Sequence, residues 1–166
     1  MVFVTVGTHE QQFNRLVEYV DNMVVCGILQ DEVIIQTGYS TYQPQQCEWQ
    51  NFYPYPQVEA FVQKADIVIT HGGPSSFLMP LMLGKIPIVV PRQAKYGEHV
   101  NDHQLVFCRQ MVSRMGKILV VEDIEDLKNK ITCYHEIISG MGKTIESGNA
   151  EFKGKLGKLV DELFDY

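Results

Sequence analysis

Short apolar runs alternate along the chain with segments in which apolar residues recur at helical spacing. The apolar runs predict strands at Val2–Val6, Val33–Ile35, Asp66–Thr70, Ile86–Val90 and Lys117–Val121, with a weaker strand at Cys47–Asn51. Helical spacing predicts helices around Phe13–Val20 and over Val58–Lys64, Ser75–Leu83, Glu98–Met111, Ile124–Ser139 and Lys143–Phe164. Strands that are almost continuously Val and Ile, separated by helices, indicate an α/β fold in which a parallel sheet has helices on both faces.

The chain has 166 residues, which fits one domain over residues 1–166, with residues 140–166 as a helical tail. The tail carries one apolar helical stripe, made of Phe152, Leu156, Leu159, Val160, Leu163 and Phe164. The stripe either covers the sheet of this domain or contacts a partner protein, and the pattern fits both equally. Ligands of such sheets bind beyond the carboxyl ends of the strands, so the loops after the strands are the candidate site.

Charge and cysteine content narrow the classes of function. The net charge is −6 without a basic block, which disfavours a nucleic-acid binder. The four cysteines (Cys26, Cys47, Cys108 and Cys133) form no CxxC pair, so we expect free thiols in a reducing compartment. No acidic metal motif is found, and we expect neither a metal nor a cofactor. The apolar start is too short for a signal peptide and no run spans a membrane, which predicts a cytoplasmic protein with peripheral membrane contact.

The loop after the first strand contains Gly7, Thr8, His9 and Glu10. Gly7 permits a tight turn, and Thr8 is placed to cap the next helix, whose N-terminal amides would then face the crevice and bind a phosphate or a polar group. The alternative is an ordinary helix cap beside an exposed histidine.

The loop after Asp66–Thr70 reads His71, Gly72, Gly73, Pro74, Ser75 and Ser76. Two glycines allow a phosphate to approach backbone N–H groups, and the serines add hydroxyl donors in the first turn of the following helix. The loop is neither a Walker motif nor a GxGxxG motif, and a structural role for the glycines and for His71 is the alternative.

The loop after Ile86–Val90 is the most polar of the three. Asp102, His103 and Gln104 suit sugar hydroxyls, and Arg92 and Lys95 suit negative charge. A solvated helix start would tolerate the same residues. Aromatic residues in Tyr39–Gln46 and Trp49–Tyr55 either cover a nucleobase or pack against the edge of the sheet.

Together the segments Val4–Glu10, Thr70–Ser76 and Glu98–Gln104 resemble the small catalytic subunit of bacterial capsular and exopolysaccharide galactosyltransferases. That subunit is similar to the soluble half of the eukaryotic two-subunit UDP-GlcNAc transferase and to the glycosyltransferase family 28 C-terminal domain. The resemblance runs from Met1 to about Val121. It implies a Rossmann-like sheet equivalent to the C-terminal half of a GT-B enzyme.

The resemblance also implies roles for individual residues. The donor diphosphate would lie at His71, Gly72, Gly73, Ser75 and Ser76, the donor sugar at Asn101–Gln104, and the uracil near Phe52 and Tyr53. The loop of Gly7, Thr8 and His9 would face the acceptor. Where the family often has an acidic residue that contacts the ribose, this chain has Met79, followed by Pro80, which should kink the helix.

The implied reaction is an inverting transfer of galactose or N-acetylglucosamine from a UDP-sugar to a lipid-linked saccharide in polysaccharide biosynthesis. Arg92 and helix N-terminal amides are candidates to stabilise the leaving diphosphate, and His9 and Glu98 are candidate bases. The base can also lie on a membrane-anchored acceptor-binding subunit, so we expect the chain alone to be poorly active. The alternatives are a non-catalytic nucleotide-sugar-binding module and a fragment of an enzyme like UDP-GlcNAc epimerase.

Overall fold

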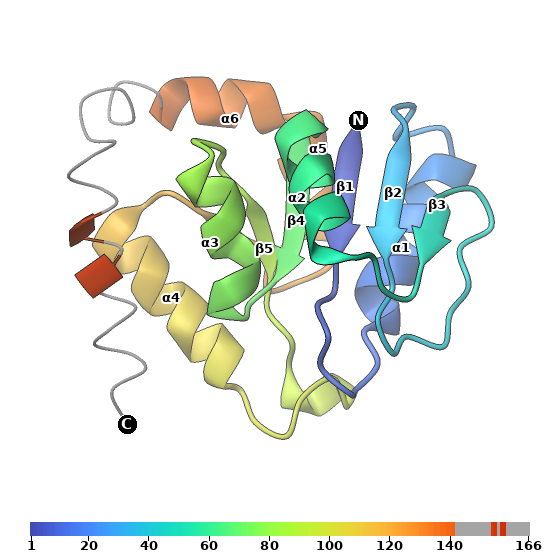
Figure 1. The fold of residues 1–166 in the computed structure, drawn as a ribbon, viewed down its shortest axis with the longest axis horizontal. Helices are drawn as coiled ribbons and strands as arrows, with labels where there is room; N and C mark the ends of the chain where they lie inside the picture. The colour runs from blue at the N-terminus through green and yellow to red at the C-terminus, as the bar shows by residue number, and fades with distance from the viewer. Residues whose placement is uncertain (142–153, 156, 159–166) are drawn as a thin grey trace.

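The sheet has six parallel strands in the order β3-β2-β1-β4-β5-β6 (Figure 1). The computed structural model describes residues 1–141, 154–155 and 157–158. The strands are β1 (Val2–Thr5), β2 (Val33–Gln36), β3 (Glu48–Gln50), β4 (Ile67–His71), β5 (Ile88–Val90) and β6 (Leu119–Val120). This strand order is that of a doubly wound, Rossmann-like sheet, as the sequence predicted.

Helices connect the strands and cover both faces of the sheet. They are α1 (Asn14–Val25), α2 (Tyr55–Lys64), α3 (Pro74–Met82), α4 (His103–Met115), α5 (Asp126–Thr132) and α6 (Tyr134–Met141). A short 3-10 turn, η1 (Ala94–Tyr96), follows β5. In Figure 1, α2 lies in front of the strands and α1 behind them.

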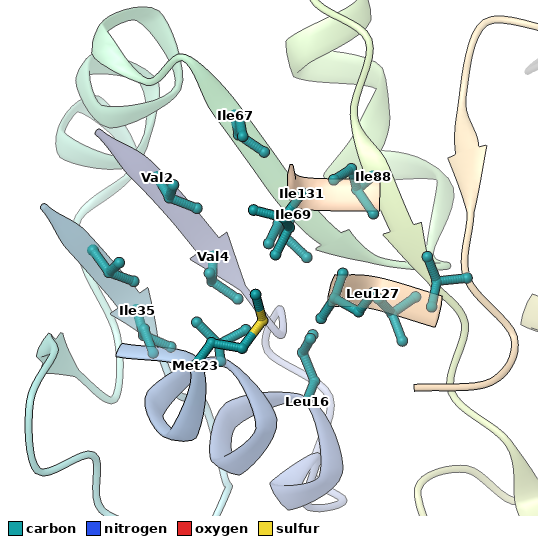
Figure 2. Close-up of a cluster of buried hydrophobic side chains, with 14 of the residues drawn as sticks. Val2, Val4, Leu16, Met23, Ile35, Ile67, Ile69, Ile88, Leu127 and Ile131 are labelled. Atoms are coloured by element: carbon teal, nitrogen blue, oxygen red, sulfur yellow. The ribbon is translucent and has the colours of Figure 1, made fainter. Parts of the chain in front are cut away.

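Alternation along the strands divides the core between the two faces. Val2 and Val4 of β1 join a cluster with residues of α1 and α5, including Leu16 and Leu127 (Figure 2). Phe3, between them, points to the other face and packs beneath α2. A third cluster holds α3 and α4 against β5 around Phe77 and Cys108. The period-two alternation of strand side chains therefore lets one apolar run serve two cores.

The order of the strands reverses between β1 and β4, which are neighbours in the sheet although far apart in the chain. At such a point the loops after the two strands turn to opposite faces and leave a crevice at the carboxyl edge. The loops singled out in the sequence, at Gly7 and at His71, follow these two strands.

Several predicted element boundaries are wrong. The expected helix Ile124–Ser139 is two helices, α5 and α6, separated at Cys133. The expected helix Glu98–Met111 begins only at His103 and continues to Met115. Thr8 does not cap α1, which begins at Asn14 with Phe13 at its N-cap position and no side-chain cap.

The helix α3 continues past Pro80 to Met82, with Pro74 at its first turn. The predicted helix Lys143–Phe164 lies largely outside the described residues, and all members of its apolar stripe lie outside them. Within the part of the chain that the structure describes, no helix is long and apolar enough to cross a membrane.

Candidate donor-binding cleft

A cleft of about 730 Å³ opens at the carboxyl edge of the sheet, where β1, β2 and β4 end. It receives predicted site residues from two loops: Gly7, Thr8 and His9 after β1, and His71, Ser75 and Ser76 at and after β4. Tyr53 and Gln104 also line it. Loops distant in the sequence thus meet at one edge, as the order of the strands requires.

His71 occupies the floor of the cleft and is held between two glycines. A Cβ atom at Gly7 would lie 2.3 Å from Nε2 of His71, and a Cβ atom at Gly73 would lie 2.4 Å from its Cε1. Gly7 also has a φ of +74°, which L residues with side chains rarely adopt. Both glycines are therefore required by the packing of the imidazole.

The ring of His71 is uncharged. Its Nδ1 accepts a hydrogen bond of 2.9 Å from the N–H of Gly73, so this nitrogen carries no proton. Burial, and then the positive charge of Arg92, lower the pKa of His71 to about 3. At neutral pH the cleft therefore has a neutral imidazole at its floor.

Gln104, at the start of α4, links two of the loops. Its Oε1 accepts hydrogen bonds from the N–H of Gly72 (3.0 Å) and from the N–H of Arg92 (3.1 Å). Gln104 was expected to contact the donor sugar, and it does line the cleft. Because its oxygen already has two backbone donors, the side chain also fixes the loops after β4 and β5 relative to each other.

The two serines of α3 differ in their surroundings. The hydroxyl of Ser76 donates to the carbonyls of His71 (3.0 Å) and Gly73 (2.7 Å), which holds the turn in place. Ser75 is exposed and lines the cleft in the first turn of the helix. Ser75 is thus the serine whose hydroxyl is available to a ligand.

One wall of the cleft is apolar and is built by α2, α3 and the segment before α2. It consists of Val58, Val62, Tyr53 and Met79. Gln36 at the end of β2 positions this wall, since its Oε1 accepts the N–H of Tyr53 (3.1 Å). The hydroxyl of Tyr53 is buried and has no hydrogen-bond partner among the described residues. Met79 contributes a thioether to this wall, where the resemblance implies a carboxylate.

Arg92 does not reach the cleft. Its guanidinium is fully buried and donates to the carbonyls of Val6 (2.8 Å), Gln11 (2.9 Å), Gln12 (3.1 Å) and Glu98 (3.1 Å). The sequence suggested that Arg92 stabilises a leaving diphosphate. The structure instead uses the side chain to join the loop after β1 to the loop after β5.

Glu98 is also buried, and the expectation that it acts as a base does not fit its surroundings. Its carboxylate forms a bidentate ion pair with Arg15, with distances of 2.7 and 2.9 Å. Oε2 additionally accepts the N–H of Gln93 (3.0 Å). Since both oxygens have donors and the residue is fully buried, Glu98 is a structural anion. The sequence pattern could not show this because Arg15 is far away along the chain.

His9 lies at the rim of the cleft, where it stacks on His99. The ring centroids are 4.6 Å apart and the ring planes differ by 13°. Burial is the main cause that lowers the pKa of His99, followed by the charges of His9 and Arg92. His9 was predicted as a candidate base from its place after the first strand, but His99 is far away along the chain and carries no local signal of this contact.

Other predicted donor contacts lie away from the cleft walls. Asp102 accepts the N–H of Ala94 (2.8 Å), and the side chain of Asn101 accepts the N–H of His103 (3.0 Å). Phe52 is exposed and packs edge-on against Tyr39. A role for these residues in sugar or base binding stays a prediction.

The lining of the cleft, as far as the structure describes it, has no Lys or Arg side chain, which is unusual for a site that binds an anion. Among the described residues that line the cleft, none is Lys or Arg, and one, Glu10, is acidic. The groups in this lining that can bind a phosphate are therefore the hydrogen-bond donors at the first turn of α3. The described residues contain no group of His, Cys, Asp and Glu side chains arranged to hold a metal ion.

The amino-acid sequence around this cleft matches a known protein family. Residues 1–138 match the glycosyltransferase family 28 C-terminal domain. The chain belongs to this family. The family 28 domain covers every residue that lines the cleft, so the cleft is a feature of a glycosyltransferase domain.

A human protein, UDP-N-acetylglucosamine transferase subunit ALG13, is 35% identical over 119 residues. The match covers 66% of this chain and 10% of the human protein, so this family 28 chain spans about a tenth of that relative's length.

Two solved glycosyltransferases are also similar. The glycotransferase of kitacinnamycin has a TM-score of 0.57 at 17% identity, over 97% of this chain and 42% of that one. SnogD from Streptomyces nogalater has a TM-score of 0.49 at 18% identity, over 73% and 31%. The former likeness confirms the expected fold, a Rossmann-like sheet corresponding to part of a GT-B glycosyltransferase.

Proposed function

We propose that this chain is the donor-binding part of an inverting glycosyltransferase that uses a UDP-sugar. The observation that supports it is a cleft at the point where the strand order reverses, inside a family 28 C-terminal domain, with the first turn of α3 at its wall. UDP-N-acetylglucosamine is the favoured donor because the human relative is named for it, and UDP-galactose is the alternative from the sequence resemblance.

The diphosphate would bind at the first turn of α3, with the hydroxyl of Ser75 as a side-chain donor. The neutral ring of His71 lies beside this turn and adds no charge of its own. The uracil would lie near Tyr53, against the apolar wall that includes Val58 and Met79. Anion binding then depends on oriented backbone dipoles and hydroxyls instead of on cations.

The reaction is a single displacement at the anomeric carbon of the donor sugar. The helix N-terminus stabilises the negative charge that develops on the departing UDP. His9 is the base that takes the proton of the acceptor hydroxyl, since Glu98 is held in its ion pair with Arg15. Neither a metal nor a cofactor enters the proposal.

The acceptor side of the reaction would come from a partner subunit. The human relative is named as a transferase subunit, which supports a partner of this kind. We propose a membrane-anchored partner subunit that binds a lipid-linked saccharide, with this chain at the cytoplasmic face of the membrane in polysaccharide synthesis. The chain alone would then bind donor but transfer sugar slowly or not at all.

Calorimetric titration of the chain with UDP, UDP-GlcNAc, UDP-galactose and ATP tests the donor assignment. We expect UDP and one UDP-sugar to bind and ATP to bind at least tenfold more weakly. Ser75→Asp should weaken UDP binding at least tenfold, because it places a carboxylate where the diphosphate would lie, while Asp itself is tolerated in a first helical turn.

The matched control is Ser113→Asp on the exposed surface of α4, outside the cleft, which should bind UDP like the wild type. Equal binding of ATP and UDP, an absence of UDP binding, or normal UDP binding by Ser75→Asp would each contradict the assignment.

Met79 supports a second candidate, a nucleotide-sugar-binding module without catalytic activity. Met79 lines the cleft with a thioether, at the place where the resemblance implies an acidic residue that contacts the ribose. Sugar transfer by the chain together with its acceptor-binding partner would exclude this candidate, and donor binding without turnover in that assembly would support it.

A further inference from the structure

The ring of His9 is oriented by the side chain of Gln11, which is not among the predicted site residues. Nε2 of His9 lies 3.0 Å from Oε1 of Gln11. An amide oxygen only accepts hydrogen bonds, so this contact is a hydrogen bond when the imidazole proton is on Nε2. Among the described residues, none forms a hydrogen bond with Nδ1 of His9, which is then the unprotonated nitrogen.

The backbone of Gln11 is itself held in place by a buried side chain, that of Arg92. Its carbonyl accepts a hydrogen bond of 2.9 Å from the buried guanidinium of Arg92. The same guanidinium donates to the carbonyl of Glu98, the residue before His99. One buried cation therefore fixes the backbone beside both partners of His9: the amide whose oxygen accepts the hydrogen bond of its Nε2, and the ring on which it stacks.

We propose that Gln11 is a positioning residue that sets the tautomer of His9, so that Nδ1 is the nitrogen that receives the acceptor proton. This inference rests on the proposed function. As the acceptor oxygen bonds to the anomeric carbon, its O–H bond breaks and the proton moves to Nδ1. The bond between the anomeric carbon and the phosphate oxygen breaks, and UDP leaves with the electron pair.

The arrangement follows the logic of a base oriented by a third group. A carboxylate or carbonyl that accepts a hydrogen bond from one ring nitrogen fixes which nitrogen faces the reaction. Gln11 supplies the acceptor without a negative charge. His99 contributes the stacked face, and burial, followed by the charges of His9 and Arg92, lowers its pKa, which disfavours protonation of His99 beside the ring that takes up a proton.

Nitrogen-15 spectra of the histidine rings in the full chain, recorded at a pH of about 8 where a free imidazole is neutral, test the tautomer directly. We expect His9, identified by comparison with His9→Gln, to carry its proton on Nε2. Gln11→Glu keeps an acceptor at the same place and should retain this tautomer. Gln11→Ala should give a mixture of both tautomers.

The kinetic consequence is measured in the assembly with the acceptor-binding partner. Gln11→Ala should lower kcat at least tenfold with UDP affinity unchanged within about twofold, and Gln11→Glu should restore kcat to within about threefold of the wild type. Gln110→Ala, an exposed glutamine of α4, is the matched control and should change neither quantity.

A His9 proton on Nδ1 in the wild type, or an unchanged kcat in Gln11→Ala, would overturn the inference and leave donor binding untouched. Failure of UDP to bind in calorimetry would overturn the proposed function instead, while the tautomer of His9 remains measurable. The two failures are therefore distinguishable.

Discussion

At the scale of single residues, the cleft is shaped by close contacts around one imidazole. Gly7 and Gly73 each leave room for His71, but for different reasons. Gly7 combines a positive φ with the contact, whereas Gly73 has a φ of −72° and a ψ of 133°, which any residue adopts. The requirement for glycine at position 73 is therefore purely steric, and it depends on the ring beside it.

This difference predicts a coupled pair of substitutions. Gly73→Ala should destabilise the fold by about 1–3 kcal/mol, as is typical of overpacking, because its Cβ would lie 2.4 Å from the ring of His71. In a His71→Ala background the same change should cost close to nothing. Gly7→Ala should stay costly in that background because its backbone strain remains. Urea unfolding of the single and double variants measures the coupling.

If Gly73→Ala lowers the free energy of unfolding equally with and without His71, the contact with the imidazole is not the cause of the destabilisation.

The roles of individual side chains were the feature that the sequence predicted least well. The sequence placed Gly7, His71 and Ser75 at the cleft because each lies at or just after the end of a strand, which the local pattern reveals. Arg92 and Glu98 occupy the same kind of position but turn inward, since their partners (Val6 and Arg15 among them) lie some 80 residues away in the chain. Gln11 and Gln36 were missed because a lone glutamine carries no local signal.

At the scale of elements, the strands were predicted well and the helix boundaries poorly. A buried parallel strand is an unbroken apolar run, and β1, β2 and β4 have this pattern. The start of α4 could not be located, because the polar stretch from Glu98 to Asp102 looks like a first helical turn. Its leading residue is instead committed to a buried ion pair, and the chain becomes helical only at His103.

The loops after β1 and β5 form one unit because Arg92 joins them. A lysine at this position presents a compact ammonium in place of a planar fork and cannot reach all four carbonyls. We expect Arg92→Lys to lower the free energy of unfolding by about 2–4 kcal/mol, since buried carbonyls lose their donors. Urea unfolding measures the loss, and amide hydrogen exchange should be faster in both loops.

Arg109→Lys is the control for that substitution. Arg109 forms an exposed ion pair with Glu122 at 2.7 Å, and such surface pairs contribute little. A loss of less than about 1 kcal/mol is expected there. A similarly small loss for Arg92→Lys would show that the loops do not depend on the guanidinium.

At the scale of the whole molecule, the neutral histidine in the cleft makes global stability depend on pH. The pKa of His71 is about 3 in the folded chain, against an ordinary value near 6.5, and burial is the main cause. Above about pH 6.5 the ring is neutral in both states, and its contribution to stability is complete. Below that pH the unfolded chain binds a proton that the folded chain excludes, so stability falls.

We therefore expect the free energy of unfolding to fall by up to about 1.4 kcal/mol per pH unit between pH 6 and pH 4 on account of this residue. His71→Asn should lack this part of the slope. The exposed His135 provides the control, since His135→Asn should keep the wild-type slope. Urea unfolding at several pH values measures both, and equal slopes in His71→Asn and the wild type would contradict the expectation.

The absence of Lys and Arg from the described lining of the cleft affects the rate at which an anionic ligand associates. The chain as a whole carries a net charge of −6, so its long-range field repels a nucleoside diphosphate. The attraction of helix amides acts only within the first turn. Added salt therefore screens the repulsion more than the attraction, and capture of an anionic ligand speeds up with ionic strength, opposite to the behaviour of a site steered by basic residues.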